Sequence, residues 1–161
     1  MTEPLVSLCV PTRNRAEGLA RGLASTCGQD YGRLEILISD NASDDHTERV
    51  CREMAAEDNR IRYIRQPKNI GLYGNHNFCL DESRGEFICF FHDHDDRDRS
   101  IVSRYVRFMQ EHPTVGVVCS DWNVVDAAGE RIDSRDRKVP TVVPGLEFIN
   151  RTFASGRSSL N

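Results

Sequence analysis

The sequence predicts an α/β fold, an αβα sandwich with a mainly parallel central sheet, and three observations support that prediction. Short apolar runs typical of strands alternate with stretches of helical periodicity. Several of these runs are apolar on both faces, as the buried strands of a parallel sheet are. The resulting order of strand, helix, strand, helix and strand is typical of this layered architecture. The 161 residues suffice for one domain with a hydrophobic core, so a single domain over residues 1–161 is expected.

Five apolar runs are predicted strands, at residues 5–10, 34–39, 61–64, 87–91 and 115–119. The segment SDWNVVDAAGERI then predicts a further pair of strands joined by a turn at Ala127 to Gly129. The tail from Pro144 to Asn161 predicts one helix and a polar loop.

Helices are expected in the intervals between the strands. One apolar stripe at positions i, i+3, i+4 and i+7 lies between the second and third strands and consists of Thr47, Val50, Cys51 and Met54. Asp45 and Glu48 predict a capping box at the start of that helix. A similar stripe follows the fourth strand and consists of Ile101, Tyr105, Phe108 and Met109.

Composition and charge narrow the function classes. The formal net charge is −4 and the basic residues are not clustered, which excludes an electrostatic footprint for nucleic acid or for a membrane surface. Six cysteines are scattered singly with no C-x-x-C pair, which favours free thiols over zinc knuckles or redox motifs. We find no signal peptide and no transmembrane segment in the sequence, so a cytoplasmic location is expected.

Polar residues follow each of the first four predicted strands. Because ligands of parallel α/β sheets bind beyond the carboxyl ends of the strands, these four loops are the candidate site. Each motif has a structural alternative: Asp40 could start an Asx turn, Gly71 and Gly74 could serve only turns, and His76 and His112 could be surface histidines. The four loops comprise residues 11–15, 40–45, 66–77 and 92–98.

The last of these loops carries two histidines and four carboxylates between His92 and Asp98. Two like charges about 4 Å apart repel by about 4 kcal/mol at an effective dielectric constant of about 20, so the cluster needs full solvation or a cation. The spacing of Asp93 and Asp95 suits Mg²⁺ or Mn²⁺ that bridges a diphosphate.

A second metal motif overlaps the first. His92, His94 and Asp96 follow the H-x-H-x-D-H spacing of the two-zinc hydrolases of the metallo-β-lactamase type. Arg97 stands where that motif requires its last histidine, and downstream only His112 remains as a further ligand. A two-zinc site would therefore lack ligands, which disfavours a metal-dependent hydrolase.

In combination, the loops resemble one family. The segments VSLCVPTRNR, EILISDNASDD and KNIGLYGNHNFCLDESRGEFICFFHDHDD are similar in order and spacing to the nucleotide-binding half of the family 2 glycosyltransferases. The resemblance runs from about Val6 to Asp126 and implies their Rossmann-like GT-A fold.

The resemblance also implies roles for single residues. Asp40 would hydrogen-bond the nucleobase, and Asp93 would contact the nucleotide as well as a metal ion. His94 stands where many relatives have an aspartate, which leaves open whether Asp93, His94 and Asp95 all bind the metal and whether the preference shifts from Mg²⁺ toward Mn²⁺. The nucleobase and ribose would lie against Pro11, Thr12 and Asn14, with Asn69, Gly71, Asn75 and Asn77 flanking the nucleotide. The metal ligands, for Mn²⁺ or Mg²⁺, would be Asp93, His94 and Asp95.

The resemblance implies an inverting glycosyltransferase that uses a nucleoside-diphosphate sugar and a hydroxyl of a glycan or lipid-linked acceptor, in cell-surface polysaccharide synthesis. In that family the acceptor-binding part, with its carboxylate base, lies beyond the matched region. We therefore expect a chain truncated before that part, and we assign no catalytic base. The alternatives are a non-catalytic nucleotide-sugar-binding module that lacks the acceptor half and, more remotely, the metal-dependent hydrolase.

Overall fold

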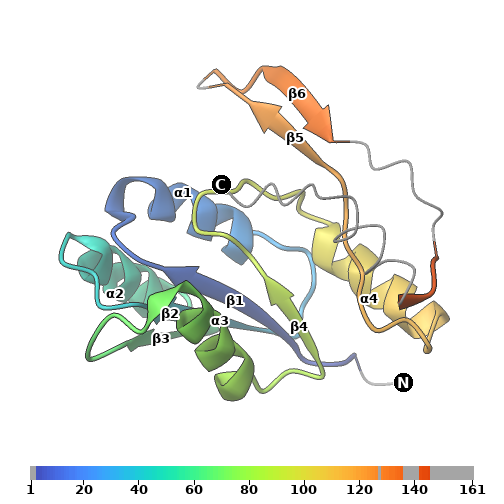
Figure 1. Ribbon diagram of the computed structural model, residues 1–161, viewed down its shortest axis with the longest axis horizontal. Helices are drawn as coiled ribbons and strands as arrows, with labels where there is room; N and C mark the ends of the chain where they lie inside the picture. The colour runs from blue at the N-terminus through green and yellow to red at the C-terminus, as the bar shows by residue number, and fades with distance from the viewer. Residues whose placement is uncertain (1–2, 127, 136–141, 146–161) are drawn as a thin grey trace. The chain divides into compact units, whose positions relative to one another are not determined.

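The computed structural model describes residues 3–126, 128–135 and 142–145, in which strands and helices alternate as the sequence predicts (Figure 1). Its elements in chain order are β1 (Val6–Thr12), α1 (Ala16–Cys27), β2 (Leu34–Asp40), α2 (Thr47–Glu57), β3 (Ile61–Arg65), α3 (Gly71–Glu82), β4 (Phe87–Phe90), α4 (Ile101–Glu111), β5 (Trp122–Val125) and β6 (Arg131–Arg135).

Strands β1 to β4 form one sheet in the order β3-β2-β1-β4. All of its pairs are parallel, and the register of the central pair runs from Val6 opposite Leu34 to Thr12 opposite Asp40. The carboxyl ends of all four strands therefore lie at one edge of the sheet, which we call the carboxyl rim. The predicted α/β fold with a mainly parallel sheet is confirmed.

Helices cover both faces of this sheet, because alternate residues of each strand point to opposite sides. On one face, α1 and α2 pack on the strands, and the core includes Leu8, Leu19, Ile36, Cys51 and Val102. On the other face, α3 packs through Cys79 on a smaller cluster with Cys9 and Leu37 (Figure 1). These layers are the predicted αβα sandwich.

The end strand β4 is less buried than predicted. Its sequence suggests a strand that is apolar and covered on both faces, but Ile88 is 40% exposed and the strand ends at Phe90. The cause is its position, since β4 is the last strand of the four-stranded sheet. Phe91, directly after it, is 1% exposed and belongs to the core. The segment with the acidic residues, which begins at His92, therefore follows directly after a core residue.

The predicted strand at residues 115–119 is wrong, because the structure has no strand in that described segment, where Val117 is 75% exposed. A strand needs a neighbour to satisfy its backbone groups, and an apolar pattern alone does not supply one. The pair of strands predicted after it is confirmed as the antiparallel β5 and β6, with Gly129 at a φ of 84° in the turn. Ala127 and the predicted tail helix beyond Gly145 lie outside the described residues.

Helices α2 and α4 contain the predicted apolar stripes, but the capping box of α2 does not form. His46 is the N-cap residue and makes no side-chain capping bond. Asp45 Oδ1 accepts a hydrogen bond from the backbone N–H of Thr47 at 2.9 Å, whereas Glu48 binds Arg52 at 2.8 Å one turn later. The Glu48 carboxylate is thus paired with Arg52 and, at 3.3 Å, with Arg65 Nε, and not with the start of the helix.

The chain forms two compact units, residues 1–106 and 107–161. The first unit contains the whole parallel sheet and its carboxyl rim, and the second contains the β5 and β6 hairpin. The single domain expected from the chain length stays a prediction. No helix of the described residues combines the length and the apolar composition that a membrane span requires.

Candidate functional site

A short hydrogen bond joins the end of β1 to the loop after β4 at the carboxyl rim. Pro11 and Thr12 are the last residues of β1, paired with Ser39 and Asp40 of β2. The buried Thr12 hydroxyl donates to Asp93 Oδ2 at 2.6 Å. Residues predicted to contact the nucleobase and residues predicted to contact the diphosphate are therefore brought together by this bond.

Asn14 joins the loop after β1 to the loop after β2. Its φ of 52° lies in the left-handed region, which asparagine adopts more readily than most residues. Its Oδ1 accepts a hydrogen bond from the N–H of Asp44 at 3.0 Å, and its own N–H donates to Ser43 Oγ at 2.9 Å. Ala42 in the second loop is also left-handed, with a φ of 56°. Hydrogen bonds therefore join the loop after β1 to the loop after β2 at the carboxyl rim.

Asp40 is fully buried and has hydrogen-bond partners on both carboxylate oxygens. Oδ1 accepts bonds from the N–H and the hydroxyl of Ser43 at 2.9 and 2.5 Å. Oδ2 accepts a bond from the Tyr63 hydroxyl at 2.8 Å and lies 3.7 Å from Arg65 Nε. Since a carboxylate accepts about four hydrogen bonds, the predicted bond to a base would use its remaining capacity or replace one of these partners.

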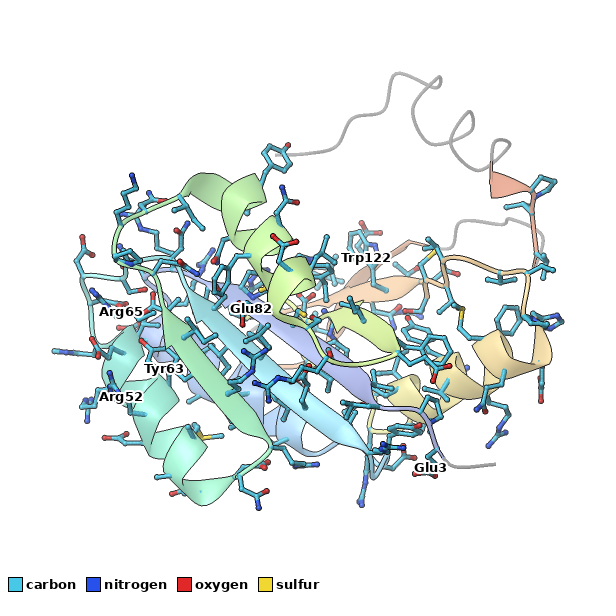
Figure 2. The ribbon with its side chains drawn as sticks, turned by 90° about the horizontal axis from the view of Figure 1, so that it is seen from below. Glu3, Arg52, Tyr63, Arg65, Glu82 and Trp122 are labelled. Atoms are coloured by element: carbon cyan, nitrogen blue, oxygen red, sulfur yellow. The ribbon has the colours of Figure 1, made fainter. Side chains whose placement is uncertain are left out.

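Tyr63 and Arg65 complete this part of the site although no sequence motif points to them. Figure 2 shows both on β3, with Arg52 of α2 near Tyr63, and Arg52 Cζ lies 5.5 Å from the Tyr63 ring centroid. Burial, and then the bond to Asp40, raises the pKa of the Tyr63 hydroxyl, so it remains a donor at neutral pH. The one feature of the sequence that could have indicated Tyr63 and Arg65 is their spacing from Ile61. Alternate residues of a strand point to the same face, so all three share one face of β3.

The four residues predicted to flank the nucleotide have different surroundings. Asn69 Oδ1 accepts bonds from the N–H of Gly71 and from Nδ2 of Asn41, each at 2.9 Å, which shapes the start of α3. Asn75 is buried, and its Oδ1 accepts a bond of 2.6 Å from a serine hydroxyl of β2. Asn77 is exposed. Asn75 therefore fastens α3 to the sheet, and the other three border solvent.

Residues 92–100, which we call the acidic loop, begin with a nearly buried carboxylate. Asp93 is 7% exposed, and Thr12 occupies one of its oxygens. The other oxygen, Oδ1, lies 3.0 Å from Nδ1 of His94 and 3.9 Å from Nε of Arg15. Groups of the chain itself therefore balance the Asp93 charge.

Asp95 is the more accessible of the two carboxylates that the D-x-D spacing predicts as metal ligands. Its side chain is 40% exposed, with Oδ2 3.1 Å from Arg97 Nη2 and Oδ1 3.7 Å from His94 Nε2. The Arg97 guanidinium lies 4.6 Å from the ring centroid of Phe91, and its buried Nε has no hydrogen-bond partner among the described residues. A cation of the chain thus offsets the charge of the carboxylate that is predicted to bind metal.

The chemistry of these donors fits a hard divalent cation. The carboxylates of Asp93 and Asp95 are ligands that Mg²⁺ and Mn²⁺ favour, and the His94 imidazole suits Mn²⁺ better. Within the described residues, no three histidine, cysteine or acidic side chains gather in an arrangement that could hold a metal ion by themselves. A cation here would therefore take further oxygen ligands from a bound diphosphate or from water, as Mg²⁺ commonly does.

A row of aromatic rings borders the acidic loop. The His76 ring stacks on Phe90 with centroids 5.1 Å apart, and His92 lies 6.5 Å from His76 and 6.1 Å from His94. Partial desolvation lowers the pKa of the His92 imidazole from its ordinary value. His112, the histidine that remains downstream as a further ligand for a two-zinc site, has its ring centroid 4.4 Å from that of Phe108.

Comparison with known proteins gives a consistent result. The chain matches the profile of Glycosyl transferase family 2 over residues 7–154. It is similar to a GalNAc(5)-diNAcBac-PP-undecaprenol beta-1,3-glucosyltransferase of Campylobacter jejuni, with 39% identity over 94 residues, which are 58% of this chain and 30% of that protein. The chain thus spans under a third of this relative.

Two solved structures share the arrangement of strands and helices. The mannosyltransferase PcManGT from Pyrobaculum calidifontis, in complex with GDP-Man and Mn²⁺, has a TM-score of 0.66 and 26% identity, over 71% of this chain and 34% of that one. Residues 1–349 of TarS from S. aureus, in complex with UDP-GlcNAc, have a TM-score of 0.63 and 22% identity, over 75% of this chain and 40% of that one. The second likeness concerns the fold alone.

Proposed function

The chain belongs to glycosyl transferase family 2, and we propose that its carboxyl rim binds a nucleoside-diphosphate sugar as the donor half of an inverting glycosyltransferase. The observation that carries this proposal is the 2.6 Å bond between Thr12 and Asp93. It brings the loop suited to a base and ribose next to the loop suited to a diphosphate. A nucleotide diphosphate has the same order of groups along its length.

The loops after β1, β2 and β3 would hold the nucleoside. Pro11 and Thr12 end β1 and Asn14 follows in the next loop, whereas Asn69 and Gly71 lie at the start of α3 and Asn77 lies further along that helix. Asp40 would orient the base, either directly or through the loop that it braces with Ser43 and Tyr63. Asn75 would contribute indirectly, because its hydrogen bonds to β2 hold α3 in place.

The acidic loop would hold the diphosphate. Asp95, with Asp93 and His94 beside it, would bind Mn²⁺ or Mg²⁺, and such a cation offsets negative charge on the leaving diphosphate. The complex of PcManGT with GDP-Man and Mn²⁺ supports this reading. Arg97 already contacts Asp95 at 3.1 Å, so cation binding would compete with that ion pair. Arg97 would then be free to contact a phosphate oxygen.

In the proposed reaction the bond between the anomeric carbon and the diphosphate oxygen breaks while an acceptor hydroxyl oxygen bonds to that carbon from the opposite side. The hydroxyl proton passes to a base, to which we assign no described residue. The acceptor would be a glycan or lipid-linked sugar of a cell-surface polysaccharide, consistent with the name of the Campylobacter relative. We place this chemistry in the cytoplasm, which suits the free cysteines.

A panel of nucleotide sugars tests the proposal by thermal shift. UDP- and GDP-sugars are added to the chain with MnCl₂, and donor hydrolysis is then assayed for every donor that raises the melting temperature. We expect at least one donor to raise it, with ATP as a control that does not. Binding without hydrolysis would favour a nucleotide-sugar-binding module. No shift with any donor at millimolar concentration would contradict the proposed function.

A further inference from the structure

Helix α1 contacts the backbone of the acidic loop directly at one glycine. Gly22 is buried, and a Cβ atom at this position would lie 2.6 Å from the carbonyl oxygen of Asp93 and 3.0 Å from its carbonyl carbon. Two atoms that are not bonded do not approach so closely, so any side chain here would displace the Asp93 peptide. The absence of a side chain therefore lets the start of the acidic loop lie against α1.

The end of the acidic loop is fixed just beyond the same helix. The buried Gln29 side chain donates from Nε2 to the carbonyl oxygen of Asp98 at 3.1 Å, and its Oε1 accepts from the N–H of Val102 at 3.3 Å. The N–H of Asp30 also donates to the carbonyl oxygen of Arg99 at 3.0 Å. Helix α1 and the residues after it thus hold both ends of the loop.

Between these fixed ends, the acidic loop bonds mainly to itself. Arg97 binds Asp95, and the backbone N–H of Arg97 donates to Asp96 Oδ1 at 3.0 Å. At the start of the loop, which α1 holds, Asp93 also accepts the hydrogen bond from the Thr12 hydroxyl. The positions of Asp93 and Asp95 relative to the end of β1 therefore depend on where α1 holds the loop.

We propose that Gly22 and Gln29 are positioning residues, through which α1 fixes both ends of the acidic loop and so sets the placement of its carboxylates for binding a nucleotide diphosphate. The inference rests on the proposed function. Neither residue has to touch the nucleotide. Gly22 acts through the Asp93 peptide, and Gln29 acts through the backbone at Asp98 and Val102.

A matched pair of substitutions tests the role of Gly22. Gly18 lies one turn earlier in α1, and a Cβ atom there would meet nothing within 4 Å. Both Gly18→Ala and Gly22→Ala remove a helix-destabilising glycine, so the two changes share the same effect on helix propensity. We expect Gly18→Ala to keep the affinity for UDP or GDP with MnCl₂, whichever binds the wild-type chain, and Gly22→Ala to lower it about tenfold or more.

The ratio of nucleotide affinity with MnCl₂ to that with excess EDTA separates positioning from general destabilisation. Partial unfolding would lower both affinities in proportion, whereas a displaced acidic loop would lower mainly the first. Calorimetry gives both affinities, and urea unfolding gives the stability of each variant. The expected result is a lower ratio in Gly22→Ala and an unchanged ratio in Gly18→Ala.

A second pair of variants covers the case in which Gly22→Ala fails to fold. Gln29→Ala removes the side-chain bonds to Asp98 of the loop and to Val102 of α4, whereas Gln29→Glu keeps the acceptor for the N–H of Val102 but loses the donor to Asp98. We expect the affinity ratio to fall in Gln29→Ala and also in Gln29→Glu, because the ionised carboxylate that replaces the amide cannot donate to the carbonyl oxygen of Asp98. If the wild-type chain binds nucleotide and folded Gln29→Ala or Gly22→Ala binds equally well, the positioning role is wrong. If the wild-type chain binds neither UDP nor GDP, the proposed function itself fails.

Discussion

The loop after β2 and the acidic loop after β4 both place carboxylates at the carboxyl rim, but they treat the charge differently. Asp40 in the first loop is fully buried, and Ser43 and Tyr63 donate to both of its oxygens. Asp95 in the second loop is 40% exposed and has an ion pair with Arg97. The carboxylate of the first loop thus has its hydrogen-bond partners without a ligand, whereas the carboxylate of the second loop is accessible to one.

The largest effect expected from this difference is on stability. Asp40→Ala would leave the Tyr63 hydroxyl and the Ser43 donors without their acceptor, so we expect the free energy of unfolding to fall by about 3 kcal/mol. Urea unfolding measures this change. Asp44→Ala is the control, because the Asp44 side chain is exposed in the same loop and should change stability by less than about 0.5 kcal/mol. Equal losses of unfolding free energy in the two variants would show that Asp40 does not have this structural role.

A substitution in the acidic loop should change ligand binding more than stability. Asp95→Asn keeps the shape of the side chain but removes its charge, so we expect nucleotide affinity in MnCl₂ to fall about tenfold, or about 1.4 kcal/mol. The free energy of unfolding should change by less than about 1 kcal/mol, because the lost ion pair with Arg97 is partly exposed.

The neighbouring carboxylate supplies the control for this prediction. Asp96→Asn removes the same charge from an exposed side chain one residue later in the loop. Calorimetry with MnCl₂ should give nearly wild-type nucleotide affinity for Asp96→Asn. The reverse outcome, in which Asp96→Asn weakens binding and Asp95→Asn does not, would shift the predicted metal ligands by one residue.

Asp58 provides a reference carboxylate whose charge is already paired outside both loops. Hydrogen bonds from Arg60 lower the pKa of Asp58 from 3.8 to about 2. Because the folded-state pKa is the lower one, the ionised form stabilises the protein above about pH 4, and this contribution is lost as the pH falls toward 2.

The Asp58→Asn variant should therefore be less stable than the wild type by at most about 1 kcal/mol at pH 7, and the difference should vanish near pH 2. Urea unfolding across this pH range checks the prediction. Nucleotide affinity should stay unchanged, since Asp58 lies between α2 and β3, at the opposite end of the strands. A difference in stability that does not depend on pH would mean that the Arg60 pair is not its source.

The residues of the carboxyl rim were predictable because apolar runs mark where each strand ends, and the polar residues after them must lie at one edge. The surroundings of Asp40 were not predictable, since Tyr63 and Arg65 come from another strand and face Asp40 only through the register of β2 and β3. The contact of Gly22 with Asp93 likewise depends on how α1 packs, which local periodicity does not specify.

The central claim is that the acidic loop binds a nucleotide diphosphate through a divalent cation. Titration calorimetry of UDP and of GDP into the wild-type chain, in MnCl₂ and in excess EDTA, tests it most directly. We expect one nucleotide to bind at least tenfold more tightly with MnCl₂, because opposite charge then enters beside Asp93 and Asp95. Equal affinity in MnCl₂ and in EDTA would contradict the claim and would leave the acidic loop as surface charge balanced by Arg97 and Arg15.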